Sequence, residues 1–447
     1  MKLFRYIFAL ILLSFIYGCD KNLKTKNLEK VEFELSLIEL DSNRIKNDIL
    51  KLASFGNTEL DGNERIAYSD YNVEALAWLQ AELEALNLKV SIDFAGNLIA
   101  VRDGINNNLK PIGFGSHIDC VPSGGHYDGQ IGVLAGLEIF RALNENNIKT
   151  NHPLELIVFS NEEGGVFGSR ALAGVITDET MDVMTASGLT NFQGVNKLGG
   201  NSDRIFEVAR EYPAFHSFIE LHIEQGAVLE EANLDIGVVQ GIVGLRWWDV
   251  EITGFTNHAG TTPMDRRNDA MLAASEFTLA VNEIVNSIEG THVGTVGRIQ
   301  AYPGVPNVIA GKVILSLELR DLSNEKLDIL FNKINKRSSQ ISKKYGTPFE
   351  FRRLSATGEP ALTSIAVQDI IEKVSDKLNL TSVRMPSGAG HDAQEMALIA
   401  PTGMIFIPSK NGISHSAAEY STISQVQNGY LTLLHSILAI DKLDSLD

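Results

Sequence analysis

Short apolar runs alternate with helical stretches through most of this chain, and this alternation constrains the fold more than any other feature. Apolar runs typical of buried strands lie at 97–101, 112–118, 154–159, 218–223 and 403–407. Apolar residues recur at helical spacing within 72–87, 131–143 and 365–378. The alternation predicts an α/β layer around a mostly parallel sheet, in which site residues gather at the carboxyl ends of the strands.

A different pattern over 244–355 predicts a second domain inserted into the first. Apolar and polar residues alternate around 248–252 and along 312–320, and a long helix is expected after Pro263. A second amphipathic helix is expected over 327–341, followed by a strand at 349–353. We therefore expect a small α+β, ferredoxin-like domain that interrupts a catalytic domain made of 33–243 and 356–447.

Length and charge limit the classes of function. The chain has 447 residues, of which 44% are hydrophobic, so it can bury more than one core. Its formal net charge of −18 argues against a nucleic-acid partner, because phosphate backbones are bound mainly through Lys and Arg. Only two cysteines occur, Cys19 and Cys120, which argues against a disulfide framework.

The first 18 residues have the features of an export signal. Lys2 and Arg5 precede an apolar run at 6–17, which is shorter than the roughly 20 residues that span a bilayer. The segment ending in Gly18-Cys19 resembles a bacterial lipobox, which implies lipidation of Cys19 and a polar tether over 19–32. We expect an exported lipoprotein whose membrane contact is its lipid alone. An ordinary cleaved signal with an incidental cysteine is the alternative.

Potential metal ligands follow the apolar run at 112–118. His117 and Asp119 are two residues apart, so in a strand their side chains would share one face. Asp128 stands where a helix begins, a position that favours a carboxylate as a cap or as an anionic ligand. We expect Asp119 to hold the imidazole of His117 and Asp128 to bridge two cations. A helix-capping Asp128 beside a structural histidine is the alternative.

Two adjacent glutamates, Glu162 and Glu163, follow the apolar run at 154–159. Burying two carboxylates is costly unless cations neutralise them. One of the pair can bind a metal while the other accepts a proton from water, which is the combination that a dinuclear metal hydrolase needs. On a surface loop the same pair would simply be solvated.

Two further histidines complete a mixed set of ligands. His222 lies on one side of the run at 218–223, and His415 lies in a polar turn beyond the run at 403–407. Taken singly, each could be a structural histidine. Together with the earlier residues they supply the imidazoles and carboxylates that paired zinc or manganese ions require, and cobalt or nickel would suit the same ligands.

These segments, in this order, resemble the amidase/hydantoinase/carbamoylase family, which lies within the aminoacylase/carboxypeptidase-like metallopeptidases. The resemblance runs from about Leu37 to the C-terminus. The segments that carry it are Gly115-Ser116-His117-Ile118-Asp119, Gly124-Gly125 with Asp128-Gly129, Asn161-Glu162-Glu163-Gly164, His222-Ile223-Glu224-Gln225-Gly226, Asn257-His258-Ala259-Gly260, Gly388-Ala389-Gly390-His391-Asp392 and Ser414-His415-Ser416. The family includes N-carbamoyl-L-amino-acid hydrolases, β-ureidopropionases and allantoate amidohydrolases.

The resemblance implies a ligand set for two divalent ions per subunit. One ion would be held by His117, Asp128 and His222, and the other by Asp128, Glu163 and His415. Glu162 would be the general base, and Asp119 would support the site. A histidine at 222 favours the amidase branch, because related metallopeptidases usually carry a carboxylate there.

The resemblance also implies substrate contacts. His258, Asn307 and Arg320 match positions that bind the substrate carboxylate or the developing oxyanion, with His258 reaching the site from the partner subunit's lid. Gln225 and His391 match positions on the substrate side. The inserted domain would then be a lid that forms a homodimer.

Three departures from the family pattern leave the substrate open: Cys120 replaces Thr or Ser, Val166 replaces Arg and Ala227 replaces Pro. The expected reaction is hydrolysis of the C–N bond of an N-carbamoyl amino acid. Allantoate hydrolysis, a dinuclear aminopeptidase or dipeptidase, and a non-catalytic binding lipoprotein are the alternatives.

Overall fold

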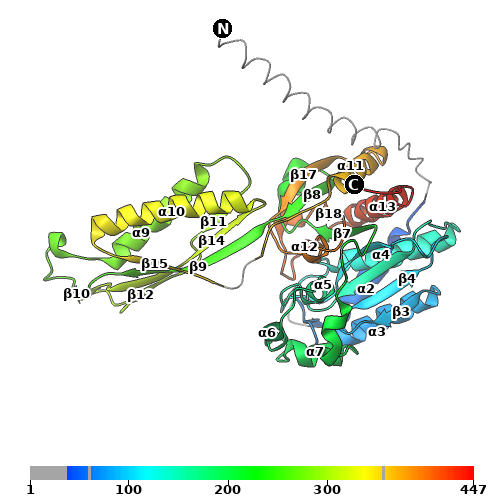
Figure 1. The fold of residues 1–447 in the computed structure, drawn as a ribbon, viewed down its shortest axis with the longest axis horizontal. Helices are drawn as coiled ribbons and strands as arrows, with labels where there is room; N and C mark the ends of the chain where they lie inside the picture. The colour runs from blue at the N-terminus through cyan, green and yellow to red at the C-terminus, as the bar shows by residue number, and fades with distance from the viewer. Residues whose placement is uncertain (1–37, 59–61, 355–357, 447) are drawn as a thin grey trace, which may run out of the picture.

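The computed structural model describes residues 38–58, 62–354 and 358–446. The predicted signal peptide, the polar tether and Cys19 lie outside the described residues. Two sheets dominate the structure, one in each of two bodies that lie side by side (Figure 1). Within the described ranges, no helix combines the length and the apolar character needed to cross a membrane.

The larger sheet has nine strands and a parallel centre. The order is β16-β8-β18-β7-β5-β6-β4-β3, and β17 pairs with β8. Its strands are β3 (Lys89–Ile92), β4 (Leu98–Arg102), β5 (Ile112–His117), β6 (Leu154–Phe159), β7 (Ser217–Ile223), β8 (Ile236–Ile242), β16 (Ala361–Leu362), β17 (Ser382–Ser387) and β18 (Thr402–Ile407). The four central strands β18, β7, β5 and β6 run parallel, whereas β3 and β4 pair antiparallel at one edge.

Helices cover both faces of this sheet, so its central strands are buried. Every residue of β5, β6, β7 and β18 is buried, which explains why these strands are continuous apolar runs. The helices of this body are α2 (Ser42–Ala53), α3 (Asp70–Ala85), α4 (Gln130–Glu145), α5 (Phe167–Leu172), α6 (Asp178–Met181), α7 (Asn191–Lys197), α8 (Val228–Ala232), α11 (Ile365–Lys377), α12 (Asp392–Met396) and α13 (Ile423–Ile440). The predicted α/β class with a mostly parallel sheet is confirmed.

The smaller sheet is antiparallel, with the order β11-β14-β9-β15 and with β12 also paired to β14. Its elements are β9 (Gly244–Thr253), α9 (Ala270–Asn286), β11 (Val293–Thr295), β12 (Ile299–Tyr302), β14 (Lys312–Asp321), α10 (Asn324–Tyr345) and β15 (Phe349–Arg353). The chain order is strand, helix, three strands, helix and strand. Because β11 and β12 pair with successive parts of β14 and act as one edge strand, this is the expected ferredoxin-like motif. We use the name lid domain for 244–355.

Residues of β14 alternate between two environments. Val313, Leu315 and their alternate neighbours are fully buried against α9 and α10, which cover one face of the lid sheet (Figure 1). Glu318 and Arg320 stand on the opposite face and are only partly buried. This period of two is the one that the sequence predicts for a strand with a single packed face.

The remaining short elements are β1 (Asn57–Thr58) with β2 (Gly62–Asn63), β10 (Asn257–His258) with β13 (Val308–Ile309), and three 3-10 helices, η1 (Ser202–Val208), η2 (Met264–Arg266) and η3 (Lys410–Gly412).

Candidate metal centre and active site

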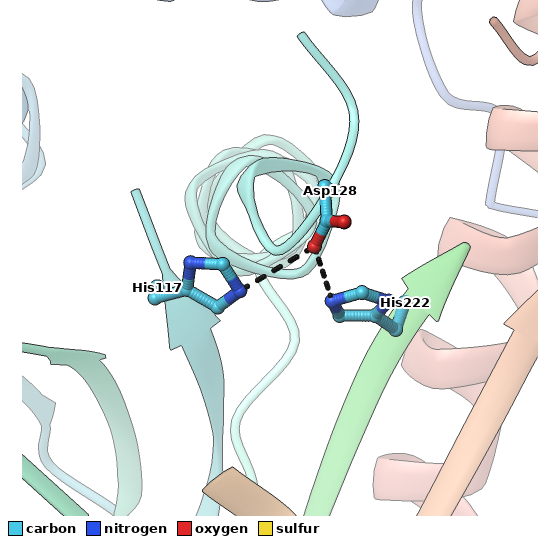
Figure 2. A group of neighbouring side chains, drawn as sticks. All are labelled: His117, Asp128 and His222. Atoms are coloured by element: carbon cyan, nitrogen blue, oxygen red, sulfur yellow. Dashed lines mark ion pairs between the residues drawn. The ribbon is translucent and has the colours of Figure 1, made fainter. Parts of the chain in front are cut away.

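The predicted ligands converge because they end neighbouring parallel strands. His117 is the last residue of β5, Glu162 follows β6, and His222 lies near the end of β7, in a sheet whose local order is β7-β5-β6. Asp128 precedes α4 and projects between the two imidazoles (Figure 2). Its Oδ1 lies 3.6 Å from His117 Nε2 and 3.0 Å from His222 Nε2.

Backbone carbonyls orient both imidazoles. His117 Nδ1 lies 2.9 Å from the carbonyl oxygen of Asp119, and His222 Nδ1 lies 2.9 Å from that of Ile223. A carbonyl oxygen can only accept a hydrogen bond, so each Nδ1 is the donor. In the neutral form of either ring, Nε2 therefore carries the lone pair that a metal ligand requires.

Asp119 contacts the His117 ring mainly through its backbone carbonyl. Because β5 ends at His117 and the chain then turns, the Asp119 carboxylate lies farther away, with Oδ1 at 3.9 Å from Nδ1. It accepts hydrogen bonds instead from the backbone amides of Glu162, at 3.4 Å, and Glu163, at 3.2 Å. Asp119 thus positions the loop that carries the two glutamates.

The position of His117 fits a cation. Its Nε2 is buried and has no hydrogen-bond partner among the described residues, although Glu162 Oε2 lies 3.5 Å away. A buried polar atom without a partner costs about 1–3 kcal/mol, and a cation would supply the partner. Gly129 makes room for the ring, since a Cβ there would lie 2.2 Å from His117 Nε2.

A second group shares Asp128. The Nε2 of His415 lies 3.4 Å from Asp128 Oδ2 and 3.5 Å from Glu163 Oε2. One ligand atom from each of these three residues lies within 4.8 Å of the others, as is also true of His117, Asp128 and His222. The structure therefore brings together all five residues that the sequence analysis named. Their binding of ions stays a prediction.

A third group of similar geometry contains Glu220, His222 and His391. Both oxygens of Glu220 already accept hydrogen bonds, one from Ser116 Oγ at 2.7 Å and one from the backbone amide of Ala393 at 2.7 Å. Burial, followed by the proximity of His222, holds the pKa of His391 well below its usual range, so this ring is neutral. We assign Glu220 to the support of the site. His391 lines the cavity, and its substrate contact stays a prediction.

Burial and neighbouring charges shift the pKa values of the carboxyl groups at this site. Burial and then the Asp392 carboxylate raise the pKa of Glu162 well above its usual range. Burial and then Asp128 raise the pKa of Glu163 to about 8. Burial opposes ionisation of Asp128 too, but His222, His415 and His117 together outweigh it and hold the pKa of that carboxyl well below its usual range.

The two histidines next to Asp128 hold protons. Burial disfavours the imidazolium of His222, but Asp128 together with Glu220 outweighs this effect, so the pKa of His222 is raised to about 9. The hydrogen bond to Asp128 raises the pKa of His415 to about 9. Without metal, protons on these two rings therefore balance part of the carboxylate charge.

Glu419 is a site residue that the sequence reasoning missed. Its buried carboxylate accepts hydrogen bonds from the backbone amides of Tyr127, at 2.8 Å, and Asp128, at 3.0 Å. It also accepts one from Ser414 Oγ at 2.9 Å, and the same hydroxyl lies 2.6 Å from Asp128 Oδ2. Its place four residues after His415 was the available signal, but a lone loop glutamate does not reveal that it is buried.

The site opens into a cavity of about 720 Å³ between the two bodies. Arg320 lines the lid side of this cavity, where its Nε donates to Glu318 Oε1 at 2.7 Å and its Nη1 donates to the carbonyl of Gly388 at 2.6 Å. Trp247 lines the same side and donates its indole N–H to Glu318. Gln225 lies on the metal side, where its amide nitrogen is 2.6 Å from Asp128 Oδ2.

The structure does not bring His258 and Asn307 into this cavity. They lie together in the β10–β13 ribbon, where the amide of Ala259 donates to the carbonyl of Asn307 at 3.0 Å, and both are exposed. Figure 1 shows β10 at the end of the lid far from the larger sheet. Within one subunit these two residues cannot act at the cavity, so their predicted role needs a second subunit.

Three residues differ from the family pattern. The first, Cys120, is buried beside the site, and burial raises the pKa of its thiol to about 12. It therefore stays protonated near neutral pH and is a poor nucleophile. Val166 lines the cavity wall, whereas Ala227 precedes α8.

Comparisons with known proteins agree on the family. Residues 113–439 match the family described as Peptidase family M20/M25/M40. The N-carbamoyl-L-amino acid amidohydrolase of Geobacillus stearothermophilus is 37% identical over 403 residues, covering 89% of this chain and 98% of that protein. The ureidoglycolate hydrolase of Arabidopsis thaliana is 34% identical over 420 residues, covering 91% of this chain and 88% of that protein.

Solved structures agree with this result. The crystal structure of an amidase of the hydantoinase/carbamoylase family from Burkholderia multivorans has a TM-score of 0.85 and 31% identity. The match covers 91% of this chain and 99% of that one. The chain therefore belongs to peptidase family M20/M25/M40 and is an amidohydrolase of its hydantoinase/carbamoylase group.

Proposed function

We propose that this protein hydrolyses an N-carbamoyl-L-amino acid, with one water, to the amino acid, carbon dioxide and ammonia. One observation carries the proposal. Two ligand groups share Asp128 beside Glu162, and they face a cavity whose lid side presents Arg320. Similarity to the Geobacillus stearothermophilus amidohydrolase, whose name specifies this class of substrate, supports it.

We propose that the two groups hold two divalent ions, with zinc first and manganese, cobalt or nickel as substitutes. Mixed imidazole and carboxylate donors suit these metals. Bound ions would polarise the amide carbonyl and acidify the attacking water.

Glu162 is suited to moving the proton. It is buried and belongs to neither ligand group, yet its Oε2 lies 3.5 Å from His117 Nε2, at the edge of the site. We propose that it accepts the proton of the attacking water and returns it to the leaving nitrogen. Such general acid–base catalysis is typically worth about 10²–10⁴ in rate.

Arg320 is suited to binding the substrate carboxylate. Two of its guanidinium nitrogens are held by Glu318 and Gly388, which fixes the plane of the fork. The third, Nη2, makes no hydrogen bond with any described residue and can donate to a ligand in the cavity. A planar guanidinium recognises a carboxylate better than an ammonium does.

We also propose that the lid domain forms a homodimer and delivers His258 and Asn307 to the cavity of the partner subunit. Exposed apolar side chains on α9 support an interface there, since Leu279 is 66% and Leu272 is 46% exposed. Analytical ultracentrifugation tests the dimer. Without a dimer, neither residue can contribute to catalysis.

The lipobox leads us to propose that the protein is exported and lipidated at Cys19. Membrane fractionation of cells that express the wild type or Cys19→Ala tests this. The proposal requires the wild type in the membrane fraction and the variant outside it, and equal distribution of the two would contradict it.

A substrate panel tests the reaction. Zinc-loaded protein is offered N-carbamoyl-L-amino acids, allantoate and dipeptides, and ammonia and free amino acid are measured. We expect the N-carbamoyl compounds to give the highest kcat/KM. A preference for allantoate or for dipeptides would replace this proposal with an allantoate amidohydrolase or a dipeptidase, and no turnover of any of them would favour a binding lipoprotein.

The adjacent glutamates give a matched pair of variants. Glu162→Gln should lower kcat about 10²–10⁴-fold while two ions stay bound, because only the proton acceptor is lost. Glu163→Gln should reduce the metal content, because a ligand is lost. Unchanged turnover in Glu162→Gln would refute the mechanism.

A further inference from the structure

The cavity has a third side, beyond the ligand residues and Arg320. It is made by α5 and α12, which pack together and are joined by a hydrogen bond from Ser169 Oγ to Asp392 Oδ1 of 2.6 Å. Arg170, next to Ser169, and Glu395, one helical turn after Asp392, both line the cavity. Val166 and Leu398 provide apolar surface on the same side.

Arg170 and half-buried Glu395 carry opposite charges, yet neither side chain has a hydrogen-bond partner in the described part of the chain. Arg170 Nε is buried without a hydrogen-bond partner. The Glu395 carboxylate accepts no hydrogen bond from a described residue, and no nitrogen of Arg170 comes within the 4.0 Å of an ion pair. Burial raises the pKa of Glu395, and Arg170 offsets part of that rise, so the two groups feel each other's charge.

Unsatisfied groups of this kind favour a ligand that can pair with both. Leaving the buried Nε of Arg170 without a partner is unfavourable. A carboxamide matches both ends, since its carbonyl oxygen accepts from the guanidinium and its NH₂ group donates to the carboxylate. A carboxylate ligand would face Glu395 with like charge, and an aliphatic group would leave both unpaired.

Resting on the proposed function, we propose that Arg170 and Glu395 form a side-chain subsite, called here the polar slot, that selects substrates whose released amino acid carries a neutral carboxamide. N-Carbamoyl-L-glutamine and N-carbamoyl-L-asparagine belong to this class. The slot determines specificity and takes no part in bond breaking.

Three substrates of similar length test the slot: the N-carbamoyl derivatives of L-glutamine, L-glutamate and L-norleucine. We expect the wild type to prefer the glutamine over the glutamate compound at least about tenfold in kcat/KM, because discrimination rests on one matched hydrogen bond and one repulsion. Glu395→Gln should bring this ratio to one or below. Arg170→Gln should lower kcat/KM for both polar substrates relative to the norleucine compound.

Glu359→Gln is the matched control. Glu359 lines the same cavity, but its carboxylate already accepts a hydrogen bond from Asn324 Nδ2 at 2.8 Å. The substitution removes the same charge from the same cavity without touching the slot, so the ratio of the glutamine to the glutamate compound should change less than about twofold. Equal changes in Glu359→Gln and Glu395→Gln would show a bulk charge effect and overturn the slot.

A binding measurement distinguishes an error in the polar slot from an error in the proposed function. Hydrolysis of the norleucine compound reports on the reaction alone. Calorimetric titration of Glu162→Gln with the glutamine and glutamate compounds reports the preference without turnover. Tighter binding of the glutamine compound that Glu395→Gln abolishes supports the slot, whereas equal affinities, or a glutamine to glutamate ratio near one in wild-type turnover, overturn it.

Discussion

Replacing Glu419 with Ala should weaken metal binding through the loop that carries Asp128. The Glu419 carboxylate accepts the backbone amides of Tyr127 and Asp128, and Gly125 packs so closely against it that a Cβ there would lie 2.3 Å from Oε1. Losing the carboxylate leaves two buried amides unpaired, at about 1–3 kcal/mol each, so the free energy of unfolding should fall by about 2–6 kcal/mol. Residues that orient ligands typically change metal affinity about 10–100-fold.

Asp441 provides a control, because its carboxylate also accepts hydrogen bonds from two backbone amides but lies away from the metal site. Its buried carboxylate accepts hydrogen bonds from the backbone amides of Asn151, at 2.9 Å, and His152, at 2.8 Å. These residues precede β6 and so lie at the amino ends of the parallel strands, opposite the metal site. Urea unfolding of the metal-free proteins should show similar losses of stability in Glu419→Ala and Asp441→Ala. Competition with a chromogenic chelator should show weaker zinc binding only in Glu419→Ala. Equal zinc affinities in the two variants would refute the positioning role.

Three further predictions concern the site. Gly129→Ala should bind about one metal ion fewer per subunit in elemental analysis, because the added Cβ would collide with Nε2 of His117. Retention of two ions would contradict the claim that this position must be glycine. Zinc affinity should rise with pH up to about 9, because zinc must displace the protons of His222 and His415. These protons should stabilise the metal-free fold fully below pH about 6.5, and the stabilisation should disappear as pH rises through 9. Zinc titrations across this pH range check the direction of the change in affinity. Urea unfolding of the metal-free protein checks the direction of the change in stability. Arg320→Lys should raise KM at least about tenfold for carboxylate substrates and little for their carboxamide analogues, since the fork is lost; equal effects on both would exclude a carboxylate contact.

Periodicity predicted the long elements well. The strands at 154–159 and 349–353 coincide with β6 and β15, and the helix expected over 131–143 is α4 with one to two residues added at each end. These segments are long enough for their burial pattern to repeat. Helices α5 and α12 are too short to repeat a pattern, so the wall that carries Arg170 and Glu395 could not be predicted.

The same limit applies within the site. His117, Glu162 and His222 were found because each stands at the end of a strongly apolar run, and neighbouring parallel strands place such ends together. Contacts that depend on how a loop turns were not accessible. The hydrogen bonds of the Asp119 carboxylate to the loop of the two glutamates and the burial of Glu419 are both of this kind.

Anomalous diffraction from zinc-loaded crystals would locate the ions directly. We expect two zinc peaks per subunit, about 3.5–4 Å apart, one among His117, Asp128 and His222 and the other among Asp128, Glu163 and His415. A single peak, or a peak among Glu220, His222 and His391 in place of the first, would contradict this expectation.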